Sequence, residues 1–271
     1  MDSAPAPRYP LDNAARQAGD RLASLAALYD SITRRHLDRL GIGPGVRCLE
    51  VGAGGGSIAR FMQQRVGPGG HVVATDIDTR WLTDSLPATV EGRCHDVGVD
   101  PLPHGAFDIV HARAVLTFVP QRRSAVARMT AALNPGGWLL IEEMVIPPAT
   151  DHPAAAPDPD RDIVQKARRA MVETIRRHGG NPAFGWELPQ LMADVGLTGI
   201  DAEGFFVPFR TAAVALLARA NIDQLGIEFR RSGLMTADEI ERYHVLLDRP
   251  DYPYPASMAL ISVWGRRKLQ E

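Results

Sequence analysis

A glycine-rich loop with acidic neighbours is the part of this 271-residue sequence most suited to chemistry. The stretch CLEVGAGGGS (48–57) places Gly52, Gly54 and Gly56 after a short apolar run, with Glu50 two residues before the first glycine. Glycines let a ligand approach the backbone without meeting side chains. The spacing G-x-G-x-G departs from the dinucleotide fingerprint G-x-G-x-x-G. A carboxylate at Glu50 also disfavours a nearby pyrophosphate, because like charges repel strongly in a low-dielectric site.

Two further acids follow the next apolar runs and narrow the choice of ligand. Asp76 stands 24 places after Gly52, close to the separation at which nucleotide-binding folds place an acid on the ribose hydroxyls. Asp96 ends the following run, where a carboxylate can accept the adenine amino group. These three acids suit an adenosyl ligand that carries positive charge and no phosphate, and S-adenosylmethionine is such a ligand. Asp108 opens the next run at its other end and is predicted to be structural.

The elements that must position these residues alternate along the chain. Apolar runs predict strands over 46–51, 71–77, 90–96, 107–112, 138–146, 200–209 and 257–267. Helical spacing of apolar residues, or the segments between strands, predict helices over 12–40, 57–66, 121–133, 161–178 and 188–195, with two more within 211–248. This order predicts an α/β fold with a doubly wound, Rossmann-like, seven-stranded and mostly parallel sheet, preceded by N-terminal helices. Ligands in such folds bind at the carboxyl ends of the strands, where the acids lie.

Composition predicts how the chain divides into a flexible N-terminus and the parts of a single domain. Residues 1–10 are rich in Pro and Ala and are expected to be flexible, whereas 11–271 form a single domain. Within it we expect a cofactor-binding core over 41–146 and a flexible connector over 147–160, which is rich in Pro, Ala and Asp. Helices 161–180 and 211–248 are expected to form a substrate cap around the C-terminal strands.

Several motifs together resemble one enzyme family. They are LEVGAGGG (49–56), VVATDID (72–78), CHDVGVDPLPHGAFDIVHARAVLTFVP (94–120) and LNPGGWLLIEE (133–143). Over roughly residues 40–143 the chain resembles the class I S-adenosylmethionine-dependent methyltransferases. LYDSITRRHLDRLGI, FGWELPQLMADVGL and ISVWGRR are similar, more loosely, to the bacterial small-molecule and natural-product branch. The resemblance implies an enzyme that converts S-adenosylmethionine to S-adenosylhomocysteine while methylating a small molecule.

The resemblance also implies roles for individual residues. Glu50, Ala53 and the two loop glycines Gly52 and Gly54 would hold the methionine part of the cofactor. Asp76 would bind the ribose, and the adenine would contact Ile77, Trp81, Asp96 and Val97. Ala112 and Arg113 would border the methyl group, and Tyr29 would close over the cofactor. Phe118 stands where many relatives carry a histidine, so the role of that histidine does not transfer.

Candidate acceptor-side residues come from the remaining histidines and aromatics. His178 and His244 are candidate general bases, although His178 at a helix end could simply complement the helix dipole. His111, Trp186 and Tyr243 are candidates for the substrate pocket, with core packing as the alternative. Methyl transfer is an in-line displacement, and the sequence does not distinguish an oxygen, nitrogen or carbon acceptor.

Composition excludes several classes of partner. The formal net charge of −2 predicts no nucleic-acid or membrane partner, and no stretch reaches the ~20 apolar residues of a membrane span. Cys48 and Cys94 are expected to be buried free thiols in a cytoplasmic, bacterial protein, and no metal-ligand spacing is present. We therefore expect a small hydrophobic or aromatic secondary metabolite as acceptor, as in antibiotic biosynthesis, and a homodimer is possible. An adenosyl-binding cyclase or regulator without transfer stays open, whereas Asp76 and Asp96 disfavour a nicotinamide dehydrogenase.

Overall fold

The computed structural model describes residues 9–82, 86–145, 158–207, 211–250 and 258–269. Its centre is a seven-stranded sheet in the order β3-β2-β1-β4-β5-β7-β6. The strands are β1 (Arg47–Val51), β2 (His71–Asp76), β3 (Val90–Cys94), β4 (Phe107–Arg113), β5 (Leu133–Val145), β6 (Thr198–Phe206) and β7 (Ala259–Arg266). Neighbours from β3 to β5 pair in parallel, and β7 runs antiparallel to both β5 and β6. The predicted doubly wound, mostly parallel sheet is confirmed.

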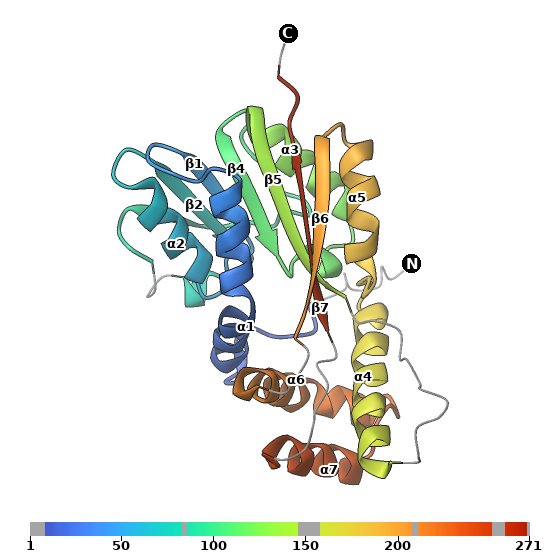
Figure 1. Ribbon diagram of the computed structural model, residues 1–271. Coiled ribbons are helices and arrows are strands. Elements are labelled where there is room, and N and C mark those ends of the chain that lie inside the picture. The colour runs from blue at the N-terminus through green and yellow to red at the C-terminus, as the bar shows by residue number, and fades with distance from the viewer. Residues whose placement is uncertain (1–8, 83–85, 146–157, 208–210, 251–257, 270–271) are drawn as a thin grey trace, which may run out of the picture.

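Helices cover both faces of the sheet (Figure 1). On one face lie α2 (Ser57–Val66) and the second half of α1 (Ala18–Arg39), whose buried side chains include Ile58, Met62 and Leu37. On the other face α3 (Arg122–Ala132) and α5 (Phe184–Asp194) bury Met129, Phe184 and Leu188 against the strands. Because Phe184 and Leu188 share one face at i, i+4 spacing, α5 begins four residues before the predicted start.

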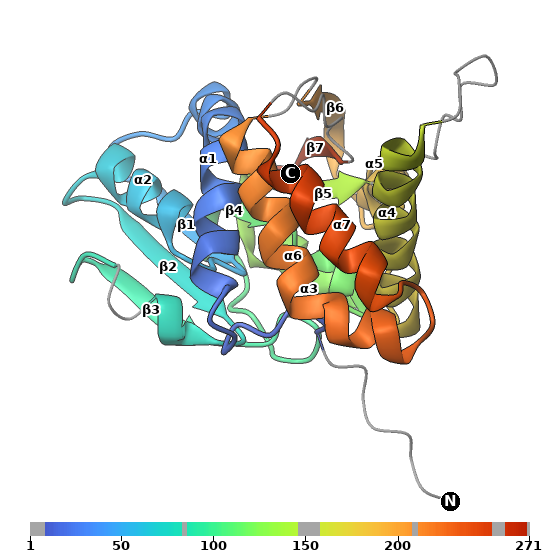
Figure 2. The same cartoon turned by 90° about the horizontal axis from the view of Figure 1, so that it is seen from below.

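Three helices form a cap beyond the carboxyl ends of the parallel strands (Figures 1 and 2). They are α4 (Pro159–Arg177), α6 (Ala212–Arg231) and α7 (Ala237–Asp248), and they share a hydrophobic core with the first half of α1. Asp158 caps α4 by accepting a hydrogen bond of 3.0 Å from the Asp160 amide. The helix therefore begins inside the range predicted as a flexible connector, whose residues 147–157 lie outside the described part.

The structure places the two cysteines differently from each other. Cys48 is buried on β1, as predicted, but Cys94 is exposed because it ends β3, the strand at the edge of the sheet. Asp108 is structural, as predicted: its carboxylate accepts hydrogen bonds from the Arg47 amide and the Asn134 side chain, at 2.9 and 2.8 Å. None of the helices within the described ranges combines the length and apolar character needed to cross a bilayer.

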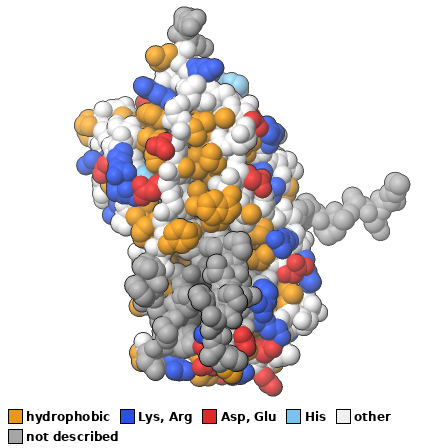
Figure 3. Space-filling view, turned by 45° about the vertical axis from the view of Figure 1, so that its right-hand side comes forward, with side chains coloured by type: hydrophobic (Ala, Val, Ile, Leu, Met, Phe, Trp, Pro, Cys, Tyr) orange, Lys and Arg blue, Asp and Glu red, His pale blue; other side chains and the backbone are white. Residues whose placement is uncertain are grey.

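Apolar side chains also gather on one outer face of the molecule, which Figure 3 presents after the right-hand side of Figure 1 is turned forward. Trp186 on α5 and Phe206 at the end of β6 are exposed, by 56% and 54%. Trp186 therefore faces solvent, and its exposure gives no support to its predicted place in the substrate pocket.

Candidate active site

A cavity of about 280 Å³ lies between the carboxyl edge of the sheet and the cap. The predicted residues that line it are Gly52, Gly54, Asp76, Ile77, Asp96, Val97 and Arg113. They come from the ends of β1, β2, β3 and β4, four strands that the topology brings to one edge. Residues of α1, α4 and α6 line the opposite side, among them Leu25, Met171 and Leu217.

The glycine loop after β1 is packed too closely to accept side chains. Gly52 and Gly54 have φ values of +67° and +52°, which L side chains rarely adopt. A Cβ on Gly52 would lie 2.2 Å from Cγ2 of Val115, and one on Gly54 would lie 2.8 Å from Cδ2 of Leu22. The loop is thus held between the turn after β4 and helix α1, and its backbone faces the cavity.

Asp76 fixes the loop and lines the cavity at the same time. One carboxylate oxygen accepts a hydrogen bond of 2.8 Å from the Gly54 amide, and the other accepts one of 3.0 Å from the Asp78 amide. Burial raises the pKa of Asp76, and these two hydrogen bonds oppose that shift. Since each carboxylate oxygen can accept more than one hydrogen bond, Asp76 keeps capacity for ligand hydroxyls.

Asp96 both caps a turn and lines the cavity. Its carboxylate accepts a hydrogen bond of 2.7 Å from the Gly98 amide and so caps the turn after β3. The residue also lines the cavity, together with Val97 and the exposed side chain of Ile77. The end of β3 therefore offers an acceptor beside an apolar wall.

Glu143, at the carboxyl end of β5, is a cavity residue that the sequence reasoning missed. Its side chain accepts hydrogen bonds from the Leu116 amide at 2.7 Å and from the Thr117 hydroxyl at 2.8 Å. These contacts hold the short 3-10 helix η2 (Leu116–Phe118). Burial raises the pKa of Glu143 to about 7, against the opposing effect of those hydrogen bonds. Its carboxylate thus fixes the wall of the cavity that follows β4.

Tyr9, another lining residue, was assigned to the flexible N-terminus by composition. Its ring meets that of Phe118 edge to face, with the centroids 4.8 Å apart. Its hydroxyl accepts a hydrogen bond of 3.0 Å from Arg21, whose guanidinium also donates to the Asn13 side chain at 2.6 Å. Arg21 thus ties the N-terminal segment across the cavity. The signal in the sequence that could have indicated this contact is the aromatic residue Tyr9 within a segment rich in Pro and Ala.

Comparison with known proteins assigns the domain that carries this cavity. Residues 49–141 match a family model described as a methyltransferase domain. The nocamycin O-methyltransferase of Saccharothrix syringae is 34% identical over 149 residues, which cover 49% of this chain and 53% of that protein. These matches show that the chain contains a methyltransferase domain.

Solved structures share the methyltransferase fold. Phosphoethanolamine N-methyltransferase 2 of Haemonchus contortus, in complex with phosphomonomethylethanolamine and S-adenosylhomocysteine, matches with a TM-score of 0.62 and 16% identity over 98% of this chain and 61% of that one. The [4+2]-cyclase SpnF matches with a TM-score of 0.52 and 19% identity over 96% and 85% of the two chains. At these identities the likeness concerns the fold. The chain spans between 50% and 67% of the length of four curated relatives that it matches.

A buried charge network runs beneath this cavity. His111 on β4 is fully buried, with Nδ1 2.6 Å from Glu50 and Nε2 3.3 Å from Glu142. Burial disfavours its charged form, but the two carboxylates outweigh burial and raise the pKa of His111 to about 9. His111 is therefore a core cation and does not line the substrate pocket, contrary to the prediction. Glu50 faces this network and is not among the lining residues, so its contact with the methionine part stays a prediction.

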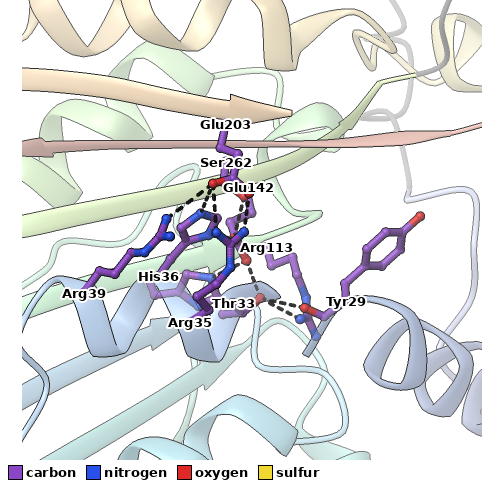
Figure 4. A network of polar contacts seen from close by, with 10 residues as sticks. Tyr29, Thr33, Arg35, His36, Arg39, Arg113, Glu142, Glu203 and Ser262 are labelled. Atoms are coloured by element: carbon purple, nitrogen blue, oxygen red, sulfur yellow. Dashed lines mark hydrogen bonds and ion pairs between the residues drawn. The ribbon is translucent and has the colours of Figure 1, made fainter. Parts of the chain in front are cut away.

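The network continues from Glu142 to helix α1 (Figure 4). Glu142 contacts the Thr33 hydroxyl, His36 Nδ1 at 3.1 Å and the Ser262 hydroxyl at 2.7 Å. Thr33 in turn accepts a hydrogen bond of 2.8 Å from Arg113, which also pairs with Asp30. Although burial opposes it, hydrogen bonds from the two histidines lower the pKa of Glu142. Arg113, which lines the cavity, is thus oriented by the same buried charges.

Stability should fall in mildly alkaline solution because of this network. The raised pKa of His111 adds stability that is fully present below its ordinary value of 6.5 and is lost as pH rises through about 9. We expect the free energy of unfolding of the wild type, relative to His111→Gln, to shrink by about 2 kcal/mol between pH 7 and pH 9 in urea titrations. The exposed His104→Gln serves as the control and should follow the wild type. A constant difference between wild type and His111→Gln would contradict a charged His111.

Both candidate bases lie outside the cavity. His178 caps the C-terminus of α4, and its Nε2 lies 3.1 Å from Glu228. His244 on α7 pairs with Asp223 at 2.9 Å. Neither histidine lines the cavity, so their prediction as general bases finds no support in the geometry.

The remaining predicted residues serve the scaffold or the cap. The Trp81 indole donates to the Asn13 carbonyl at 2.9 Å, packs beside Gly19 at the start of α1 and does not line the main cavity. The Ala53 amide donates to the Thr75 carbonyl at 2.9 Å, and Ala112 is buried within β4.

Tyr29 and Tyr243 lie in the core of the cap. They line a second, smaller cavity instead of the one beside the glycine loop. Burial raises the pKa of Tyr29 to about 12. Tyr29 thus faces cap residues around the smaller cavity, and this placement gives no support to its predicted role as a lid over the cofactor.

Proposed function

We propose that this chain transfers the methyl group of S-adenosylmethionine to a small apolar acceptor, of the kind found among secondary metabolites. The observation that carries the proposal is the position of Asp76: it lines the cavity at the end of β2 while holding the amide of the glycine loop. The acceptor would lie beyond that loop, against side chains contributed by β5, by the cap and by the residue that precedes β7. These are Met144, Met171, Leu217 and Met258.

The residues at the sheet edge fit this cofactor. Gly52 and Gly54 let the methionine part approach the backbone, and Asp76 accepts hydrogen bonds from the ribose hydroxyls. Asp96 accepts one from the adenine amino group, beside the apolar side chains of Ile77 and Val97. Residues 52–56 of the loop include no lysine or arginine, which agrees with a ligand that carries no phosphate.

The protein's contribution to the reaction is mainly alignment. When bound, the cofactor supplies a methyl group on a cationic sulfur, which is already an activated leaving group. The cavity aligns the acceptor and excludes water, and positioning of this kind can contribute up to ~7–11 kcal/mol. Tyr9 and Phe118 cover one side of the cavity, while Glu143 fixes the turn that forms another. Of the histidines in the described ranges, His95 alone lines the cavity, so we propose that neither His178 nor His244 acts as base.

Thermal melts test the cofactor assignment. Added S-adenosylmethionine or S-adenosylhomocysteine should raise the melting temperature, because ligand at ~100 times its Kd stabilises the folded state by ~2.7 kcal/mol. NAD should give no shift, since its pyrophosphate would approach a loop with no lysine or arginine of its own. A shift with NAD, or no shift with either adenosyl compound, would exclude the proposed function.

A second function on the same scaffold is an adenosyl-dependent protein without methyl transfer. The fold shared with the [4+2]-cyclase SpnF supports this alternative. The two functions differ in product: a methyltransferase releases S-adenosylhomocysteine only when an acceptor is present, whereas a cyclase leaves the cofactor unchanged. Mass spectrometry of the cofactor after incubation with candidate metabolites distinguishes them.

A further inference from the structure

A buried carboxamide, whose oxygen has no hydrogen-bond partner among the described residues, lies between the main cavity and a smaller one beside the cap helices. The smaller cavity, of about 60 Å³, is lined mainly by residues of α1, α4, α6 and α7. Four residues line both cavities: Met171, Leu217, Asn221 and Met258. The two cavities are therefore neighbours, and the smaller one borders the main cavity on the side of the cap.

Asn221 is the one polar residue of these four. It lies on α6 with only 9% of its surface exposed, and its Oδ1 atom has no hydrogen-bond partner among the described residues. Leaving a buried polar atom unpaired costs about 1–3 kcal/mol. Neighbouring buried positions of the same helix carry Leu217 and Leu225, so an apolar residue would suit the fold at this site.

We propose that Asn221 binds the acceptor: its carboxamide accepts a hydrogen bond from a hydroxyl or N–H group on an otherwise apolar, neutral molecule. The apolar body would contact Met171, Leu217 and Met258, which supply dispersion contacts but no hydrogen bonds. This inference rests on the proposed function and assigns a specificity-determining residue to it. A site of this kind discriminates strongly against analogues that lack the donor, because the buried amide is then left unpaired.

Matched probes test the inference. Calorimetric titration of the wild type, with saturating S-adenosylhomocysteine, compares 2-naphthol with naphthalene, which has the same apolar rings but no donor. We expect 2-naphthol to bind at least about tenfold more tightly. In Asn221→Leu this ratio should fall to about one, while affinity for S-adenosylhomocysteine is unchanged. Gln190→Leu, which also replaces a carboxamide by leucine but on the exposed side of α5, should keep the wild-type ratio.

The outcomes separate this inference from the proposed function. If 2-naphthol binds wild type no more tightly than naphthalene, or if Asn221→Leu keeps the preference, Asn221 is not the recognition residue. Preferential binding of 2-naphthoate would also overturn the inference, because it would assign recognition to Arg168, a cation that lines the smaller cavity. If S-adenosylhomocysteine fails to bind, the proposed function is wrong, and the same titrations without it still decide the role of Asn221.

Discussion

Asp76→Ala should weaken the binding of S-adenosylhomocysteine by at least about 100-fold. Hydrogen bonds to a charged group contribute about 1.5–3 kcal/mol each, and a ribose offers two hydroxyls to this carboxylate. The substitution also releases the amides of Gly54 and Asp78, which Asp76 now holds. Isothermal titration calorimetry measures the change directly.

Two neighbouring substitutions show whether the effect belongs to the carboxylate of Asp76. Asp78→Ala removes an acid two residues away that caps the 3-10 helix η1 (Thr79–Trp81) and does not line the cavity. This variant should bind S-adenosylhomocysteine as the wild type does. Asp76→Asn keeps an acceptor oxygen without the charge and should lose an intermediate amount, about tenfold. Binding by Asp76→Ala within threefold of wild type would remove the ribose assignment.

His111→Leu should destabilise the protein by about 3–5 kcal/mol. The substitution removes the cation that lies between Glu50 and Glu142 and leaves two buried carboxylates without it. Breaking a buried ion pair by removing one partner is costly, because an uncompensated charge stays in a low-dielectric interior. Urea denaturation at pH 7, monitored by circular dichroism, gives the difference in the free energy of unfolding.

A fully neutral version of the network provides the matched comparison. In the triple variant Glu50→Gln, His111→Gln, Glu142→Gln, all three groups keep their approximate size and their capacity for hydrogen bonds but lose their charges. Replacing a buried ion pair as a unit costs much less than breaking it. The triple variant should therefore be more stable than His111→Leu. The opposite order would mean that shape at position 111 matters and charge does not.

The fold and the cofactor edge were predictable because their signals are local in the sequence. Apolar runs bounded by glycine and proline indicate strands, and an acid directly after such a run lies at a strand end whatever the rest of the chain does. Asp76 and Asp96 follow that rule, and both line the cavity. The signal of the glycine loop is equally local, because its glycines directly follow the apolar run of β1 and indicate a tight turn before α2.

The roles of Glu50 and His111 depend on register, which no local pattern contains. Glu50 pairs directly with His111 across β1 and β4, and Glu142 approaches from β5 on the other side. The sequence separates these residues by 61 and 31 positions. Spacing along one strand indicates that a carboxylate is near the loop, but only strand pairing shows that it faces a histidine.

The predictions for Tyr29 and Tyr9 differ from the structure for a related reason. Helical periodicity predicts that Tyr29 is buried, but not whether it meets the cofactor or the cap. Composition predicted that residues 1–10 are loose, yet one hydrogen bond from Arg21 brings Tyr9 over the cavity. Such choices depend on contacts between distant segments.

Helix α1 joins parts of the molecule that would otherwise be exchangeable between relatives. Its Tyr29 packs in the cap, its Thr33 and His36 meet the charges inside the sheet, and its Arg35 and Arg39 pair with Glu203 on β6. A chimera that imports α4, α6 and α7 from another methyltransferase, in order to change the acceptor, would confront the native α1 with a foreign cap. Importing α1 as well would remove Thr33 and His36, the contacts that α1 makes with Glu142. Acceptor preference is therefore better altered by point substitutions within the cap than by exchange of the cap as a module.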